Sequence, residues 1–356
     1  MKRIVPFLFF IACIASVHGI EENVVNTRIP PQWEFQQDVF ASFSAFSPLN
    51  EHDIGVVYDI IQDRTGFVWL AGEKGLGRFD GYEFRVYHAD SLEGSLHGNL
   101  ISNLAVDEQG CLWVGHAAGI SVYHENNNTF RSVFGAFESG NVITDSNYVR
   151  ALILDGDSLI WFETADGWLN QYHRRTETIR KIHRHQTVSQ LYYRYHAILK
   201  DKDGDLFVGA RGIPPMYYDK VGKRFHTLPV DPKEIPGTKR EPDVSVLFAD
   251  KPGFVWVGGL EGIYLYEKAR NYLHKYKSGT IYDMIRSRDG DYWLGSGNGA
   301  YRINPQTGKG TIYRLNNNDP RSLGGERIFD VLKIEVAVSG CHMRMVFQHF
   351  NHSNLA

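Results

Sequence analysis

The stretch from Asp63 to Asp80, DRTGFVWLAGEKGLGRFD, carries the pattern that decides the fold. It joins an Asp-x-x-Gly turn to a short apolar run that contains Trp, and a second Gly turn leads into another short run. Five further copies follow, three clear and two degenerate, at Asp107 to Tyr123, Asp155 to Tyr172, Asp201 to Tyr218, Asp250 to Tyr266 and Arg288 to Ile303. Self-similarity at a fixed period is the signature of a repeat architecture.

Each copy has a large aromatic residue at the same place. These anchors are Trp69, Trp113, Trp161, Phe207, Trp256 and Trp293, spaced 44, 48, 46, 49 and 37 residues apart. That spacing is typical of a four-stranded propeller blade. In the first copy we expect strands at residues 56–61, 67–71, 76–79 and 82–87, joined by tight turns. A single blade cannot bury both faces, so the anchors should fill the gap between stacked blades.

The sequence therefore predicts an all-β propeller over residues 37–333, with six recognisable blades and part of a seventh. A strand within Gln37 to Phe46 is expected to help complete the seventh blade. The composition agrees, because 35 Gly and 13% aromatic residues favour many short strands and turns. The net charge of −3 is spread along the chain, and no long basic block is present, which argues against nucleic acid as a partner.

Residues 1–19 are expected to be a signal peptide. Lys2 and Arg3 precede the apolar run Ile4 to Ala15, and small residues permit cleavage after Gly19. Two alternatives remain open, a lipoprotein cleavage box at Phe10 to Cys13 and an uncleaved N-terminal anchor. The expected location is the periplasm or the cell exterior.

The repeat resembles that of the two-component regulator propeller family. The resemblance rests on the D-x-x-G-x-x-W-x-x-G core, the G-L-x-R-F-D-G-Y phrase at Gly75 to Tyr82 and the spacer at Asp319 to Leu323. It covers about residues 37–333. It implies an exported sensor region of two seven-bladed propellers, followed by a β-sandwich, a membrane helix and a cytoplasmic histidine kinase or diguanylate cyclase.

The chain departs from that family plan at its C-terminal end. A further blade begins at Arg327 to Lys333, but residues 334–356 lose the repeat. We expect this tail to be aberrant and without regular structure, and the output domain to be missing from a truncated chain. Open blade edges are then expected to promote self-association.

Sequence motifs for catalysis, cofactors or metals are weak. Asp201 to Asp205 (DKDGD) resembles a calcium loop, but it lacks the full spacing and matches the turn of the other copies, so we interpret it as a plain turn. No P-loop, nucleophile elbow or dinucleotide fingerprint is present. We therefore expect no cofactor, no metal and no enzymatic activity.

Ligands of propellers often bind at the mouth of the central channel. The residues expected there lead into innermost strands or follow second strands, and they are Tyr148, Arg150, Arg194, Tyr195, His196, Asp243, Glu73, His116, Glu163, Arg211 and Glu261. Their mix of aromatic and charged groups suits a small molecule such as a sugar or an acidic metabolite. The leading hypothesis is a ligand-sensing module. The alternatives are a propeller enzyme similar to streptogramin B lyase and a scaffold that binds only proteins.

Overall fold

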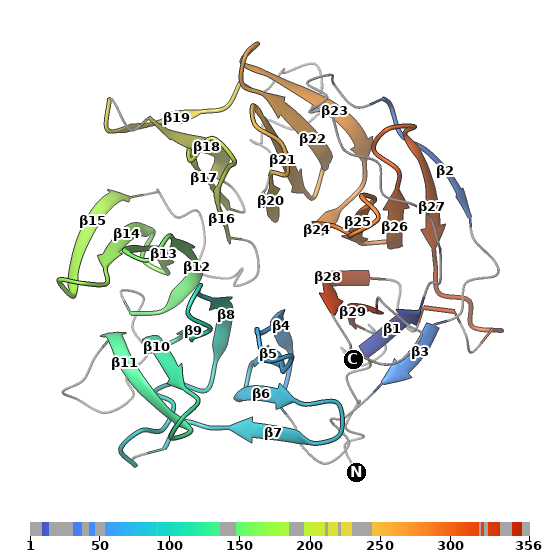
Figure 1. Ribbon diagram of the computed structural model, residues 1–356. Coiled ribbons are helices and arrows are strands. Elements are labelled where there is room, and N and C mark those ends of the chain that lie inside the picture. Colours follow the sequence, from blue (N-terminus) through green and yellow to red (C-terminus); the bar gives the residue numbers. More distant parts are fainter. Residues whose placement is uncertain are drawn as a thin grey trace. The chain divides into compact units, whose positions relative to one another are not determined.

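The computed structural model describes residues 9–13, 31–37, 43–46, 54–90, 92–135, 147–184, 196–210, 213–219, 222–229, 244–319, 322–323, 327–334 and 344–350. All regular structure in these ranges is β, and they hold no helix that could cross a membrane. Six four-stranded blades lie in a propeller arrangement, which confirms the predicted fold class (Figure 1). The chain divides into two compact units: one is Pro48–Ile281, and the other combines Met1–Ser47 with Tyr282–Ala356.

The unit Pro48–Ile281 holds five antiparallel blades, each with its strands in chain order. The first is β4 (Val57–Gln62), β5 (Val68–Gly72), β6 (Leu76–Phe79) and β7 (Phe84–Tyr87), and the second is β8 (Ile101–Val106), β9 (Leu112–His116), β10 (Gly119–His124) and β11 (Thr129–Gly135). The third is β12 (Val149–Asp155), β13 (Leu159–Thr164), β14 (Trp168–His173) and β15 (Thr178–Arg184). The fourth is β16 (His196–Lys200), β17 (Leu206–Ala210), β18 (Ile213–Asp219) and β19 (Arg224–Thr227), and the fifth is β20 (Val246–Phe248), β21 (Phe254–Gly259), β22 (Gly262–Glu267) and β23 (Tyr272–Ser278).

The spacing between the repeat Asp and the anchor Trp has a direct structural cause. Oδ1 of Asp63 accepts hydrogen bonds from the backbone N–H groups of Thr65 and Phe67, both at 3.0 Å, which closes the turn. Its Oδ2 accepts one from Nε1 of Trp69 at 2.6 Å. Trp113 bonds to Asp107 in the same way at 3.0 Å. One carboxylate therefore shapes the turn and satisfies the indole nitrogen, and none of the six anchors is more than 6% exposed.

The Gly after an anchor lets the next blade approach closely. A Cβ added to Gly115 would lie 2.9 Å from Leu152 and 3.1 Å from Val149, which are both on the first strand of the third blade. A Cβ on Gly209 would lie 2.7 Å from Val244 at the start of the fifth blade. These two glycines are needed because the facing side chains fill the space that a methyl group would require.

Side chains on innermost strands join one blade to the next. Oδ2 of Asp59 on β4 accepts hydrogen bonds from the backbone N–H of Leu104 at 2.7 Å and from Nδ2 of Asn103 at 3.0 Å, both on β8. Oδ1 of Asn103 then accepts the backbone N–H of Leu152 on β12 at 2.8 Å. Each of these bonds satisfies polar groups that the strand would otherwise leave in the core.

Ion pairs form a second set of joints between blades. Nη2 of Arg174, in the turn after β14, lies 2.7 Å from Oδ2 of Asp107 in the preceding blade. Its guanidinium carbon also lies 4.8 Å from the ring centroid of Trp113. The Asp107 side chain is 2% exposed, so this pair is well shielded from solvent.

The Asp201–Asp205 segment forms the hydrogen-bonded turn of the repeat. Oδ1 of Asp201 accepts the backbone N–H groups of Asp203 and Asp205 at 3.0 and 2.7 Å. Nζ of Lys268 from the fifth blade lies between the three carboxylates, at 2.8 Å from Asp201, 2.7 Å from Asp203 and 2.6 Å from Asp205. A lysine ammonium occupies the position at which a calcium loop would hold its ion. Throughout the described ranges, no group of three or more His, Cys, Asp or Glu side chains could hold a metal ion.

The other unit holds the sixth blade, β24 (Ile281–Arg286), β25 (Tyr292–Ser296), β26 (Gly299–Ile303) and β27 (Lys309–Tyr313). A fifth strand, β2 (Glu34–Gln37), pairs in parallel with the outer strand β27. A further sheet has the order β28 (Arg327–Ile334), β29 (Arg344–Phe350), β1 (Phe9–Cys13) and β3 (Phe43–Phe46).

The predicted partial seventh blade is not confirmed. Its expected first strand exists as β28, and β3 falls within the predicted range Gln37 to Phe46. However, β28 pairs with β29 and not directly with β3. β29 also lies in the tail that was expected to lack regular structure, where apolar residues such as Val346 and Phe347 favour a strand and pair with β28. The Phe9–Cys13 run of the predicted signal peptide forms β1.

Two aspartates join β24 to β28. Oδ2 of Asp283 accepts the backbone N–H of Val331 at 2.9 Å, as Asp59 does from Leu104. Asp330 stands where Asn103 stands in the other joint, and it shares a side-chain hydrogen bond with Asp283. Desolvation raises the pKa of Asp283. Because two carboxyl groups bond only through a proton, this joint needs a proton that the Asp59–Asn103 joint does not.

Asp330→Asn is expected to stabilise the protein at neutral pH by about 1 kcal/mol, because the amide supplies the donor permanently. The raised pKa of Asp283 means that the wild-type joint is strongest below a pH of about 4 and weakens as the pH rises through that raised pKa. The gain in urea midpoint should therefore be larger at pH 7.5 than at pH 4.5. Glu261→Gln, which removes the same charge from an exposed residue, is the control. An equal gain at both pH values would contradict the shared proton.

Candidate ligand-binding site

The described residues expected at a channel mouth are mostly buried. Tyr148 and Arg150 flank the start of β12 and are 4% and 8% exposed, with the guanidinium 6.0 Å from the tyrosine ring centroid. Tyr148 packs with Ala117 and Ala165. Glu163 on β13 is also buried, whereas Glu73 and Glu261 lie exposed in turns after second strands. Arg194, Tyr195, Arg211 and Asp243 lie outside the described residues, as does the side chain of His196, which begins β16.

His116, the last residue of β9, has both ring nitrogens engaged within its own blade. Nδ1 accepts the backbone N–H of Ala118 at 3.2 Å, and Nε2 lies 2.9 Å from Oγ of Ser121. This arrangement assigns the proton to Nε2, which donates to the serine. Burial lowers the pKa of His116 to about 3, so the ring is neutral at physiological pH. His116 fixes the β9–β10 turn and is fully covered.

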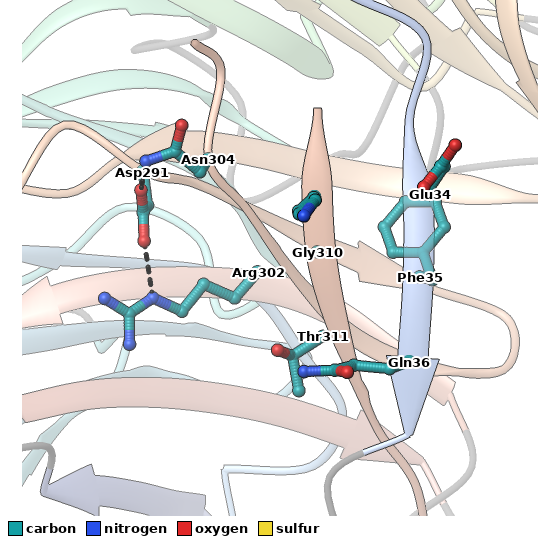
Figure 2. Close-up of a pocket in the computed structure, with 9 residues that line it drawn as sticks. Glu34, Phe35, Gln36, Asp291, Arg302, Asn304, Gly310 and Thr311 are labelled. Atoms are coloured by element: carbon teal, nitrogen blue, oxygen red, sulfur yellow. Dashed lines mark hydrogen bonds and ion pairs between the residues drawn. The ribbon is translucent and has the colours of Figure 1, made fainter. Parts of the chain in front are cut away.

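A cavity of about 500 Å³ opens beside β2 and the outer part of the sixth blade (Figure 2). Its lining residues come from β2, the β24–β25 turn and the β26–β27 hairpin, and they are Glu34, Phe35, Gln36, Asp291, Arg302, Asn304, Lys309, Gly310 and Thr311. Most of them carry hydrogen-bonding side chains. The volume lies in the range of small-molecule sites in proteins.

The aromatic ring of Phe35 fixes the β2 side of this cavity. Its centroid lies 4.9 Å from that of Tyr301 on β26, with the planes at 70°. A Cβ on Gly310 would lie 2.8 Å from the Phe35 ring, so glycine leaves the space that the ring fills. The short strand β2 is therefore held by its backbone ladder and by the packing of Phe35 against Tyr301 and Gly310.

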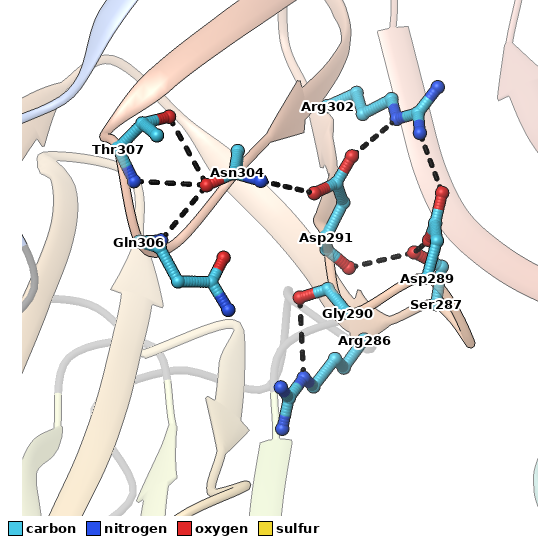
Figure 3. A network of polar contacts seen from close by, with 9 residues as sticks. All are labelled: Arg286, Ser287, Asp289, Gly290, Asp291, Arg302, Asn304, Gln306 and Thr307. Carbon is cyan, nitrogen blue, oxygen red and sulfur yellow. Dashed lines mark hydrogen bonds and ion pairs between the residues drawn. The ribbon is translucent and has the colours of Figure 1, made fainter. Parts of the chain in front are cut away.

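The opposite wall is a network around Arg302 (Figure 3). Nε of Arg302 donates to Oδ2 of Asp291 at 2.7 Å, and Nη2 donates to Oδ2 of Asp289 at 2.6 Å. The guanidinium carbon lies 5.7 Å from the ring centroid of Trp293. Two carboxylates and one indole therefore fix the orientation of the guanidinium before any ligand binds.

Asn304 extends the network toward the β26–β27 turn. Its Nδ2 donates to Oδ1 of Asp291 at 3.3 Å, and its Oδ1 accepts the backbone N–H groups of Gln306 and Thr307 at 3.1 and 2.9 Å. Burial raises the pKa of Asp291, while the bond to Arg302 acts in the opposite sense. The wall thus offers fixed planar donors and acceptors, which suit a ligand rich in hydroxyl or amide groups.

The sequence does not reveal this cavity, because the sixth copy follows the same repeat pattern as the others. One signal was available. Asp291 follows the turn glycine at a position where the first and fifth copies have Phe67 and Phe254, so a carboxylate replaces an aromatic ring. The contribution of β2 had no signal in the sequence, because no pattern identifies the partner of a four-residue strand.

Comparison with known proteins finds likeness in the fold. No protein-family model matches the sequence, and no curated protein matches it. The chain is similar to the extracellular domain of BT3049 from B. thetaiotaomicron, described as a hybrid two-component system, with a TM-score of 0.65 and 20% identity over 82% of this chain and 40% of that chain. For the extracellular domain of BT4673 from the same organism, described in the same way, the TM-score is 0.63 and the identity 19%, over 83% and 38%.

The chain is also similar to PorZ, an essential bacterial surface component of the type-IX secretion system of Porphyromonas gingivalis. That likeness has a TM-score of 0.58 and 15% identity, over 86% of this chain and 48% of that one. The chain spans less than half the length of each of these proteins. At such identities the likeness establishes the propeller fold, and the neighbours include extracellular domains of two-component systems, as the repeat implied.

Proposed function

We propose that this chain is a ligand-sensing β-propeller module of a bacterial two-component-type signalling protein, acting in the periplasm or outside the cell. The observation that carries the proposal is the preorganised polar cavity beside Arg302 and Asp291. The fold shared with extracellular domains of two-component systems supports it. The signal peptide expected at residues 1–19 would deliver the module to that location.

The ligand that fits the cavity best is a small polar molecule such as a carbohydrate. Hydroxyl groups both donate and accept, so they can pair with the fixed carboxylate, amide and guanidinium groups around Asp291, Asn304 and Arg302. The Phe35 ring offers an apolar surface for the C–H face of a sugar. Binding of this kind needs no metal and no cofactor.

The test is a thermal-shift screen of the full chain with monosaccharides and oligosaccharides, followed by calorimetry on any hit. A ligand that binds only the folded state must raise the melting temperature. Arg302→Lys keeps the charge but removes the planar fork, so affinity for the hit should fall about tenfold or more. Arg85→Lys, an exposed residue on β7, is the matched control.

Three results would count against the proposal. If no sugar raises the melting temperature, the result favours the alternative that the module is a scaffold that binds only proteins. If Arg302→Lys binds as tightly as the wild type, the ligand lies elsewhere. If the incubated ligand is consumed, the module is an enzyme, and streptogramin should be included in the incubations for that reason.

A further inference from the structure

A second cavity lies between the third and fourth blades, within the unit Pro48–Ile281. Its volume is about 370 Å³. The rings of Trp161 and Tyr218 lie in its wall with their centroids 6.1 Å apart. Three cationic side chains line it, namely Arg180 on β15, Lys200 at the end of β16, and Lys223 in the turn between β18 and β19.

One carboxylate lines the cavity, and a neighbouring cation already neutralises its charge. Among the described residues of this cavity, only Asp155 carries a negative charge. Its Oδ2 accepts a hydrogen bond from Nε1 of Trp161 at 3.0 Å, and its Oδ1 binds the ammonium of Lys200. Asp155 and Lys200 therefore neutralise each other, and Arg180 and Lys223 remain.

The remaining cations have no carboxylate partner in the described part of the chain. Arg180 and Lys223 form no ion pair there. The Lys181 side chain points to the other face of β15, where its ammonium lies 5.1 Å from the ring centroid of Trp168. The nearby carboxylate of Asp205 is engaged, because it binds Lys268 at 2.6 Å. Like charges that share a cavity repel one another, so an anion between them is stabilising.

The excess of positive charge sets this joint apart from two others of the same unit. Between the second and third blades Arg174 balances Asp107, and between the fourth and fifth blades three carboxylates surround Lys268. The whole chain has a net charge of −3, so the local excess of positive charge does not follow from composition. A concave surface of one sign concentrates oppositely charged ligands.

We propose that the cavity between the third and fourth blades binds a multiply charged oxyanion, carrying carboxylate, phosphate or sulfate groups. The Arg180 fork can hold two oxygens of one group, while Lys223 acts as a point charge toward another. An apolar portion of the ligand would lie against Tyr218. This site is separate from the polar cavity of the sixth blade and takes a different class of ligand.

The experiment is calorimetry on the full chain at low salt, with citrate, inorganic pyrophosphate and glucose 6-sulfate as probes for the three anionic groups. At least one probe should bind, and binding should weaken as salt screens the charges. The probe that binds distinguishes the three sources. If none binds, the proposal is wrong, whatever the sugar screen finds.

Two double variants locate the site. Arg180→Gln with Lys223→Gln should weaken binding of the probe by about tenfold or more. Arg85→Gln with Lys251→Gln removes the same charge from other blades and should change affinity by less than about twofold. Arg180, Lys223 and Arg85 are exposed, so the variants should fold, and their melting temperatures check this. Equal weakening in both doubles would mean general attraction of anions and would overturn the proposal.

Discussion

Trp69→Ala should lower the free energy of unfolding by about 3–5 kcal/mol, the range for truncating a large buried aromatic residue. Trp69 is 1% exposed and packs in a cluster that combines residues of the first and second blades, among them Leu104 and Leu112. Its ring centroid lies 4.9 Å from that of Tyr123. Removing the indole opens a cavity at a joint that the surrounding sheets cannot close, and it leaves one oxygen of Asp63 without its donor.

Chemical denaturation of the full chain measures this loss of stability. Two further variants separate its causes. Trp69→Phe keeps most of the ring volume but removes the bond to Asp63, so it should cost only about 1–2 kcal/mol. Tyr82→Ala removes an aromatic ring that is 96% exposed and should change stability by less than about 0.5 kcal/mol. If Trp69→Ala lowers the free energy of unfolding no more than Tyr82→Ala does, Trp69 is not packed between these blades.

Lys268→Met should lower the free energy of unfolding by about 3 kcal/mol, because it leaves three carboxylates together without their cation. The Asp201 side chain is 1% exposed, so its unpaired charge accounts for most of this loss of stability. Asp203 and Asp205 are about a third exposed, so solvent screens part of the repulsion and the loss stays at the lower end of the range for buried pairs. Denaturation at pH 7.5 measures the effect.

The pH dependence of this loss identifies its cause. In the wild type, the hydrogen bond from Lys268 lowers the pKa of Asp203. Without the lysine, repulsion should raise the pKa values of the three carboxyl groups, so the folded variant takes up protons and its deficit narrows as the pH falls toward about 4. Lys202→Met, an exposed lysine of the same turn, should have little effect. A deficit that does not change with pH would indicate lost packing and not lost charge.

The fold was predictable from sequence because local chemistry repeats with each blade. Asp63 and Trp69 lie six residues apart since one carboxylate must reach both the turn and the indole, and the same constraint acts on Asp107 and Trp113. Such constraints act within a single hairpin, so they leave a pattern in one sequence. The number of blades followed from counting the copies.

The candidate sites were much less predictable, because they combine residues that are distant in sequence. Lys268 lies 63 positions after Asp205, and no pattern in the Asp201–Asp205 turn predicts that this lysine binds there. Glu34 to Gln36 line a cavity with Arg302 only because β2 pairs with the outer strand β27. Burial is equally hard to foresee for a polar residue, as His116 shows, since its ring is enclosed by the turn that it stabilises.

The joints made by Asp59 and Asn103 also bear on how such a chain can vary in length. Both side chains lie on innermost strands and reach a backbone N–H on the next innermost strand, so the connecting loops take no part in these bonds. The spacing between anchors ranges from 37 to 49 residues in this chain. Insertions and deletions in the loops between blades can therefore accumulate during evolution without loosening the joints, whereas a one-residue shift within β4 or β8 would remove the bonding partner. Engineered insertions of peptides or tags are best placed in those loops for the same reason.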